Sequence, residues 1–228
     1  NRKDVKKYIK YLKSNKFEMP TKKSCEICGN KKTKLLQKKI SWNNNKFGVL
    51  PVHCCLKCGF VFQNPRFSKK FYFDYYKKTY RDITLKTQIP PKIYLKDQKS
   101  RGEKLYKFIK NYLPKKGSMV DLGCSVGLMM KPFLRNGWKC QGSDPIKGYA
   151  EYGKNNFKLP VQWMQSEDMK LKKNSLDLII IMGSLEHVTD VNVIMKKCAE
   201  AAKKNCLFVL EARGDPLGNT KGFFNQSH

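Results

Sequence analysis

The sequence predicts an α/β protein in which a doubly wound parallel sheet, incomplete at its C-terminal end, follows a small ribbon-like cysteine module. From residue 117 onward, apolar runs of strand length alternate with segments of helical periodicity, which is the pattern of consecutive βαβ units. Ahead of them, residues 25–66 carry two Cys-x-x-Cys-Gly pairs among short β-like runs. We therefore expect three regions: a cysteine module over 1–66, a helical linker or lid over 67–116, and an α/β domain over 117–228.

Five strands are expected in the α/β region, each apolar enough to be buried in a sheet. They are residues 118–122, 139–143, 159–163, 176–182 and 206–211. The helices expected between them are residues 126–135, 146–155 and 191–202. A complete domain of this kind would continue beyond the fifth strand, but only residues 212–228 follow, rich in Gly, Asn and Pro, and the chain begins at Asn1 rather than Met. We therefore expect that the chain is cut at both ends.

The segments ahead of the α/β region are mainly helical in pattern. Residues 4–12 fit a short basic helix, and residues 98–112 fit a longer one that a following proline ends. An aromatic-rich stretch over 67–80 and a polar linker with Pro90 and Pro91 separate this longer helix from the cysteine module.

The net charge of +29 points at first to an anionic partner such as nucleic acid. The 47 basic residues, however, divide into 41 Lys and 6 Arg and are spread along the whole chain. Phosphate and base recognition favour the planar fork of Arg, so this composition favours a generally basic, solvated surface, with nucleic-acid binding as the alternative. The longest apolar run, residues 178–182, is too short to cross a bilayer, and no membrane partner is expected.

Four of the nine cysteines have the spacing of a zinc site. Cys25 and Cys28 form one pair and Cys55 and Cys58 the other, with 26 residues between the pairs and a Gly after each. Two such pairs place four thiolates around one tetrahedral ion, which gives a closed, structural Zn²⁺ site. Cys54 does not fit the spacing and is expected to be a buried bystander. Paired and single cysteines together indicate a reducing compartment, so we expect a cytoplasmic protein.

A glycine-containing turn lies where the first expected strand meets the first expected helix. Gly123 and Gly127 let the backbone come close to a ligand there, and the helix N-terminus offers N–H groups. The next strand ends at Asp144, an acid placed to accept hydrogen bonds from both hydroxyls of a ribose. The competing use of this layout, a dinucleotide-binding oxidoreductase, requires glycine where Ser125 stands and a third glycine that is missing. Asp121 at the start of the turn suits a ligand with an amino group better than a pyrophosphate.

The segment from Asp121 to Gly127 resembles the first motif of class I S-adenosylmethionine-dependent methyltransferases, which have a Rossmann-like fold, with Ser125 in place of the usual middle glycine. Two further segments resemble motifs of this family: residues 163–169 the loop that brackets adenine, and residues 182–188 the motif that passes beneath the methyl donor. The resemblance therefore implies S-adenosylmethionine as the cofactor. The cofactor-binding residues that it implies are Asp121, Gly123, Ser125, Gly127, Asp144, Gln165, Ser166 and Gly183.

Residues 55–66, followed by Tyr75-Tyr76 and Tyr80-Arg81, resemble the zinc-binding front of a subgroup that includes C-methyltransferases acting on nucleotide-linked deoxysugars. This resemblance implies a small-molecule acceptor, either a nucleotide-linked sugar or a surface-polysaccharide precursor. In those enzymes a Glu-His pair lies at the active site, which implies catalytic roles for Glu186 and His187. His187 is the expected base for a carbon acceptor, because its unperturbed pKa is near neutrality; shaping of the pocket is the alternative role.

Two other functions fit parts of the sequence. An RNA methyltransferase would use the zinc ribbon and the basic surface to bind its substrate. A zinc-bearing binding module with an inactive methyltransferase half would account for Ser125 and the missing tail, although Asp121, Asp144 and the Glu186-His187 pair argue against lost activity. The default role of the cysteine module is a structural clip that positions the catalytic half.

Overall fold

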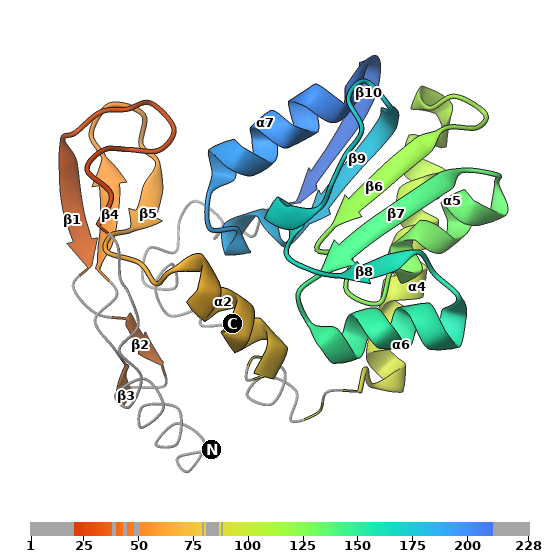
Figure 1. Ribbon diagram of the computed structural model, residues 1–228, viewed down its shortest axis with the longest axis horizontal. Coiled ribbons are helices and arrows are strands. Elements are labelled where there is room, and N and C mark those ends of the chain that lie inside the picture. Colours follow the sequence, from red (N-terminus) through yellow and green to blue (C-terminus); the bar gives the residue numbers. More distant parts are fainter. Residues whose placement is uncertain are drawn as a thin grey trace. The chain divides into compact units, whose positions relative to one another are not determined.

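The computed structural model describes residues 21–37, 40–42, 45–47, 51–78, 80, 87 and 89–211 (Figure 1). The helix expected over 4–12 and the segment 212–228 lie outside these residues. The described part of the chain divides into two compact units: residues up to Tyr72 form the first, and residues from Phe73 onward form the second. No helix within these ranges is both long and apolar enough to traverse a lipid bilayer.

The first unit is built on a small antiparallel sheet with the strand order β1-β4-β5. Its strands are β1 (Thr33–Gln37), β4 (Val52–Cys55) and β5 (Val61–Gln63), and a separate antiparallel pair is formed by β2 (Ile40–Trp42) and β3 (Asn45–Phe47). The buried cluster of this unit is small: it consists of Cys25, Cys55 and Phe62, with Cys28 and Phe60 packed at its edge. Helix α2 (Lys69–Lys78) follows and contains residues of both units.

The second unit contains a five-stranded parallel sheet with the strand order β10-β9-β6-β7-β8. The strands are β6 (Ser118–Leu122), β7 (Lys139–Asp144), β8 (Val161–Trp163), β9 (Leu176–Met182) and β10 (Ala202–Glu211). β6 is central, with β7 on one side and β9 on the other, so the chain winds outward from β6 first in one direction and then in the other (Figure 1). The prediction of a doubly wound, Rossmann-like α/β sheet is confirmed.

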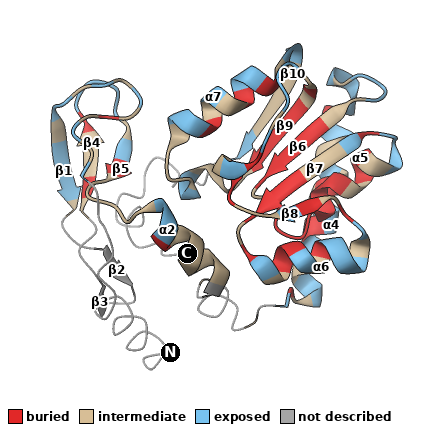
Figure 2. Ribbon diagram, viewed as in Figure 1, coloured by how far each residue is buried: buried red, intermediate tan, exposed pale blue. Residues whose placement is uncertain are grey.

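Helices cover both faces of this sheet (Figures 1 and 2). One face carries α4 (Lys92–Ile109), α5 (Lys131–Arg135) and α6 (Lys147–Phe157), and the other carries α7 (Val191–Ala201). Alternate side chains of β9 enter the two layers: Leu178 and Ile180 join the cluster under the three helices, whereas Ile179 and Ile181 join Ile194 of α7. A strand that is buried on both faces has to be apolar along its length, which explains the composition of β9.

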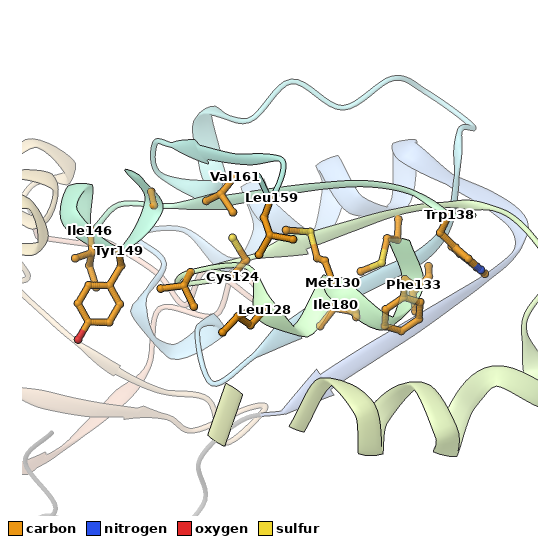
Figure 3. Close-up of a cluster of buried hydrophobic side chains, with 14 of the residues drawn as sticks. Cys124, Leu128, Met130, Phe133, Trp138, Ile146, Tyr149, Leu159, Val161 and Ile180 are labelled. Carbon is orange, nitrogen blue, oxygen red and sulfur yellow. The ribbon is translucent and has the colours of Figure 1, made fainter. Parts of the chain in front are cut away.

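The larger cluster lies beneath α4, α5 and α6 (Figure 3). Phe133 of α5 is fully buried there, and its ring meets Trp138 edge-on with 5.8 Å between the ring centroids. Tyr149 of α6 is also fully buried, and Ile109 is the buried residue in the last turn of α4. These large side chains fix the three helices against this face of the sheet.

Helix α4 starts earlier than the sequence pattern indicated. It begins at Lys92, six residues before the expected start, and ends at Ile109, after which Lys110–Tyr112 form a 3₁₀ turn. Pro91 occupies the N-cap position with a φ of −62°, a value that the proline ring imposes and that leads readily into a helix. The expectation of a polar linker up to residue 97 was therefore wrong for its last six residues.

Several elements of the sheet domain also differ from the expected boundaries; β8, for example, begins at Val161 rather than at residue 159. The first expected helix is divided: Gly127 is left-handed, Leu128–Met130 form a 3₁₀ turn, and only Lys131–Arg135 are α-helical. β10 begins at Ala202 rather than at residue 206, and its pairing with β9 is irregular between Ala202 and Leu207. Polar residues in this irregular part hide the strand from a hydrophobicity pattern.

Candidate cofactor site and candidate metal centre

The predicted cofactor residues all lie at one edge of the parallel sheet. The direction of winding reverses between β6 and β9, and ligands of open parallel sheets bind beyond the carboxyl ends of the strands at such a switch point. Asp121 and Asp144 stand at the ends of β6 and β7, and the other six predicted residues lie in the loops after β6, β8 and β9. The fold therefore gathers residues that are up to 62 positions apart in the sequence at a single edge.

The loop after β6 is a tight turn with three residues in the left-handed region. Gly123, Ser125 and Gly127 have φ values of 82°, 55° and 76°. A Cβ added at Gly123 would lie 2.5 Å from the Cβ of Ser184, and one at Gly127 would lie 2.5 Å from a methyl group of Val161. Both glycines are therefore required by close packing as well as by backbone conformation.

Asp144 is held in place by the backbone on both sides of it. Its carboxylate accepts hydrogen bonds from the N–H of Ser125 and from the N–H of Ile146, each at 2.8 Å. Only 5% of the residue is exposed. Two charge-assisted bonds fix the orientation of this acid relative to the turn after β6.

Asp121 differs from Asp144 because one of its oxygens lacks a partner. The residue is 1% exposed, and its Oδ2 atom has no hydrogen-bond partner among the described residues. Burial, and then the charge of Asp144, raise the pKa of this carboxyl to about 7, while the charge of Arg101 acts in the opposite direction. A buried acceptor without a donor fits a ligand that brings its own N–H group, as the amino group of S-adenosylmethionine would.

Gln165 and Ser166 follow β8 and lie next to the end of β7. They are 7% and 8% exposed, and Ser166 opens a 3₁₀ turn, Ser166–Asp168. The hydroxyl groups of Ser143 and Ser166 are 3.3 Å apart, which joins this loop to β7 beside Asp144. The predicted adenine loop therefore flanks the predicted ribose acid.

The loop after β9 carries the other predicted residues. Gly183 has a φ of 61°, and its N–H donates to the carbonyl of Glu211 at 2.7 Å. Glu186 and His187 belong to the 3₁₀ turn Leu185–His187, and both are exposed. The ring of Tyr76 meets the imidazole of His187 edge-on, with centroids 6.0 Å apart.

Tyr76 also contacts Tyr80, with 5.1 Å between the ring centroids. The structure shows them in an aromatic cluster that includes the predicted base.

Sequence reasoning missed two residues of α4 that reach this edge. The hydroxyl group of Tyr94 donates to Oγ of Ser125 at 2.7 Å, and Arg101 pairs with the carboxylate of Glu211 at 2.8 and 2.9 Å. Pro91 could have revealed these residues, because a proline often marks the start of a helix. A helix that starts after Pro91 has Tyr94 in its first turn and Arg101 two turns later on the same side.

In the first unit, the structure brings the four predicted zinc ligands together. The Sγ atoms of Cys25, Cys28, Cys55 and Cys58 lie within 4.8 Å of one another, with 3.6 Å between Cys25 and Cys58 and 3.5 Å between Cys28 and Cys55. Tetrahedral zinc with Zn–S bonds of about 2.3 Å requires S–S separations of about 3.8 Å, so these distances suit one ion. Cys54 is outside this group: its thiol contacts the carbonyl oxygens of Cys55 and Gly59.

The pKa values of Cys55 and Cys58 are shifted in opposite directions. Backbone hydrogen bonding from Cys58 favours the thiolate of Cys55 and, against the effect of burial, lowers its pKa to about 6. The N–H of Phe60 favours the thiolate of Cys58, but burial and the hydrogen bonds with the other three thiols prevail and raise its pKa to about 12.

A buried ion pair supports the first cysteine turn. The guanidinium of Arg66 binds both carboxylate oxygens of Glu26, at 2.7 and 3.3 Å, and their side chains are 13% and 6% exposed. The side chain of Asn64 binds the N–H and the carbonyl of Lys22, at 2.8 and 3.0 Å. The chain after β5 is thus tied to the segment that carries Cys25 and Cys28.

The parallel sheet, the glycine turn and the two buried acids at the switch point define a Rossmann-like domain with a candidate cofactor site. Residues 120–210 match the family model described as "Methyltransferase domain". This region is therefore similar to class I S-adenosylmethionine-dependent methyltransferase domains.

Among curated proteins, the chain is similar to ubiquinone biosynthesis O-methyltransferases. It is 30% identical over 96 residues to the protein of Rhodopseudomonas palustris (strain HaA2), and 32% identical over 99 residues to that of Bradyrhizobium sp. (strain ORS 278). Each match covers 40% of this chain and 38% of the relative, so the chain spans well under half the length of these proteins.

Solved structures with a similar fold include a methyltransferase from Leishmania major. It has a TM-score of 0.45 and 19% identity, and the match covers 61% of this chain and 58% of that one. Geranyl diphosphate C-methyltransferase from Streptomyces coelicolor A3(2) has a TM-score of 0.39 and 17% identity, with 44% of this chain and 42% of that one covered.

Proposed function

We propose that the chain catalyses S-adenosylmethionine-dependent methyl transfer to a small-molecule acceptor. The observation that carries this proposal is the pair of buried acids at the switch point: Asp144, oriented by two backbone N–H groups, and Asp121, whose Oδ2 lacks a donor. Both belong to a domain that matches the methyltransferase family model.

The roles that we propose follow the order of the loops. Asp144 receives the ribose hydroxyls, Asp121 receives the amino group, and Gln165 and Ser166 flank the adenine. The turn from Gly123 to Gly127 and the glycine at position 183 let the backbone approach the methionine part closely. S-adenosylmethionine, when bound, supplies an electrophilic methyl group; the chain binds and orients the two reactants and keeps water away from them.

For the acceptor, we propose a nucleotide-linked sugar or a surface-polysaccharide precursor. The resemblance of residues 55–66 to the front of sugar C-methyltransferases supports this choice. The ammonium groups of Lys77 and Lys147 lie 4.8 and 5.0 Å from the ring centre of Trp163, at the end of β8, and supply positive charge for a diphosphate. The alternative is an acceptor that is methylated on oxygen, because the similar curated proteins are O-methyltransferases.

For a carbon acceptor, we propose His187 as the base that removes the proton from the carbon, with Glu186 beside it. The imidazole is exposed at the end of β9, and the ring of Tyr76 meets it edge-on. Shaping of the acceptor pocket by the same two residues is the alternative role.

For the first unit, we propose that Cys25, Cys28, Cys55 and Cys58 bind one structural Zn²⁺ and that the module positions the catalytic half. The separations between the four Sγ atoms support this proposal.

The net charge of +29 favours a second candidate function, an RNA methyltransferase that binds its substrate with the ribbon and the basic surface. Calorimetric titration with a nucleotide sugar and with a short RNA would separate the two.

The cofactor assignment is tested by Asp144→Ala. Loss of hydrogen bonds to a charged group costs about 1.5–3 kcal/mol, which is roughly ten- to a hundredfold in affinity for S-adenosylmethionine measured by calorimetry. Asp177→Ala is the matched control. Asp177 lies near the start of β9, at the end of the strands opposite to the site, where its carboxylate accepts a hydrogen bond from the N–H of Ser118. Unchanged affinity in Asp144→Ala, or an equal loss in both variants, would contradict the assignment.

The role of His187 is tested by His187→Ala. We expect methyl transfer to be abolished while the affinity for S-adenosylmethionine stays nearly the same, because a base contacts the acceptor and not the cofactor. The parent chain should also exchange the acidic proton of a nucleotide-sugar ketone with deuterated solvent, and the variant should not. Near-normal turnover in the variant, or no exchange with the parent, would rule out carbon methylation and leave the cofactor assignment intact.

A further inference from the structure

Ser125 stands in a backbone conformation that disfavours it. Its φ of 55° is left-handed, where a side chain with a Cβ is strained relative to glycine. The residue is 7% exposed, so water does not relieve this strain. The side chain therefore needs a compensating interaction inside the domain.

The hydroxyl group of Tyr94 supplies that interaction. It donates to Oγ of Ser125 at 2.7 Å, across 31 positions of the sequence. The ring of Tyr94 packs edge-on against that of Tyr149, with 5.5 Å between centroids, and Tyr149 is fully buried. One neutral hydrogen bond contributes about as much as a single left-handed side chain costs, so the bond can hold the turn.

The donor is carried by a helix that is fixed elsewhere. Further along α4, the ring of Tyr106 meets Phe133 edge-on at 5.0 Å between centroids, and Ile109 is 4% exposed. Tyr94 therefore projects from an anchored element toward the turn after β6.

Ser125 connects this helix to the acid at the end of β7. While its Oγ accepts from Tyr94, its N–H donates to Oδ2 of Asp144 at 2.8 Å. The turn geometry at Ser125 decides where that N–H points, and the N–H in turn orients one of the two carboxylate oxygens. Two consecutive hydrogen bonds therefore connect the hydroxyl group of Tyr94, through Ser125, to the carboxylate of Asp144.

We propose that Tyr94 is a positioning residue for the cofactor, which holds Ser125 in its left-handed turn and so sets the carboxylate of Asp144 for the ribose hydroxyls. This inference rests on the proposed binding of S-adenosylmethionine at this edge. It assigns a function to the serine that replaces the middle glycine: the serine makes the turn dependent on α4.

The test measures the binding of S-adenosylhomocysteine to the full chain by calorimetry. Tyr94→Phe removes only the hydroxyl, and Ser125→Ala removes only its acceptor; each should weaken binding about fivefold, and the double variant should be no weaker than either. Tyr106→Phe is the matched control, because it makes the same change on the same helix away from the turn, and its affinity should equal that of the parent.

A second ligand separates positioning from general loosening of the fold. The 2′,3′-dideoxy analogue of S-adenosylhomocysteine lacks the hydroxyls that Asp144 receives, so Tyr94→Phe should bind it as well as the parent does. Equal weakening for both ligands, additive losses in the double variant, or a Tyr94→Phe affinity within the error of the parent's would overturn the positioning role. Failure of the parent to bind S-adenosylhomocysteine would overturn the proposed function as well.

Discussion

Among the described residues of the cysteine module, the buried cluster consists of three side chains, two of them thiols, whereas the sheet domain of the second unit has separate apolar clusters on both faces of its sheet. In the sheet domain, strands such as β9 are buried along almost their whole length. In the module, β1 exposes its three central residues and only one side chain of β5 is buried. The sheet domain therefore draws its stability from apolar burial, which the module is too small to match.

This difference shows what the four thiols contribute. A small unit without an adequate core needs a metal, a disulfide or a partner to fold. The described residues of the module offer four thiols at S–S distances too long for a disulfide and suitable for zinc. We therefore expect the two units to respond differently to the same perturbations.

The largest expected effect is that of removing the zinc ligands. Cys55→Ser should abolish stoichiometric zinc binding and unfold the module, because structural zinc contributes about 10–16 kcal/mol of folding free energy in comparable sites. Elemental analysis would give the zinc content, and hydrogen exchange would show loss of protection in β1, β4 and β5 with β6 to β10 unchanged.

Cys54→Ser is the control for this experiment. Cys54 is the neighbour of Cys55 in β4, but its thiol contacts backbone oxygens and lies outside the four-thiol group. This variant should retain one zinc ion per chain. Zinc-free parent protein prepared without chelators, or equal zinc loss in both variants, would contradict the proposed metal centre.

The next largest effect concerns the buried acid of the sheet domain. Asp121 has its pKa raised to about 7, from an ordinary value near 4, by burial and then by Asp144. An acid with a raised pKa binds more protons in the folded than in the unfolded state, so the free energy of unfolding of the ligand-free chain should fall as the pH rises from about 4 to about 7. Above pH 7 this contribution levels off.

Asp121→Asn removes this titration. Three pKa units correspond to about 4 kcal/mol in total, of which about 2–3 kcal/mol falls between pH 5 and pH 8. Urea unfolding of ligand-free parent and variant should therefore show the variant gaining that much relative to the parent over this range. A stability difference that does not change with pH would mean that Asp121 has a donor in solution.

A smaller effect is expected for the buried ion pair of the module. Arg66→Ala removes the partner that binds both carboxylate oxygens of Glu26, whose side chain is 6% exposed. It should lower the free energy of unfolding of the module by about 2–3 kcal/mol, measurable as faster loss of zinc to a chelator. Lys22→Ala is the comparison. The Lys22 side chain is 35% exposed, so its removal should lower the free energy of unfolding of the module by less than about 1 kcal/mol. Equal rates of zinc loss in the two variants would show that burial does not strengthen the Arg66 pair.

The elements that could be predicted from the sequence are those with a strong local pattern. β6 and β9 have the expected boundaries, because an apolar run bounded by polar residues is a sufficient signal for a buried strand. The gathering of the four thiols follows from the Cys-x-x-Cys-Gly spacing, in which Gly29 and Gly59 take φ values of 70° and 75°.

The features that the sequence did not reveal depend on contacts between distant residues. The bond between Tyr94 and Ser125 joins α4 to a turn 31 positions away, and no periodicity marks either partner. Asp121 could be predicted as a site residue, but its missing donor is a consequence of burial in the folded sheet. The ring contact between Tyr76 and His187 likewise joins two segments 111 positions apart.

The smallest expected effect is that of an exposed ion pair in the sheet domain, and it completes the comparison with the module. Arg135 of α5 pairs with Glu103 of α4, and their side chains are 51% and 42% exposed. Water and salt screen such a pair, and ordering two long side chains offsets much of its attraction, so Glu103→Gln should change the free energy of unfolding by less than about 1 kcal/mol. Gln is close to Glu in helix propensity, so the substitution reports on the charge rather than on the helix. Urea unfolding at low and at high salt should show any difference from the parent shrinking as salt is added. A loss as large as that of Arg66→Ala, or one that salt does not reduce, would mean that this pair is buried in solution and that the two units do not differ in how they use charge.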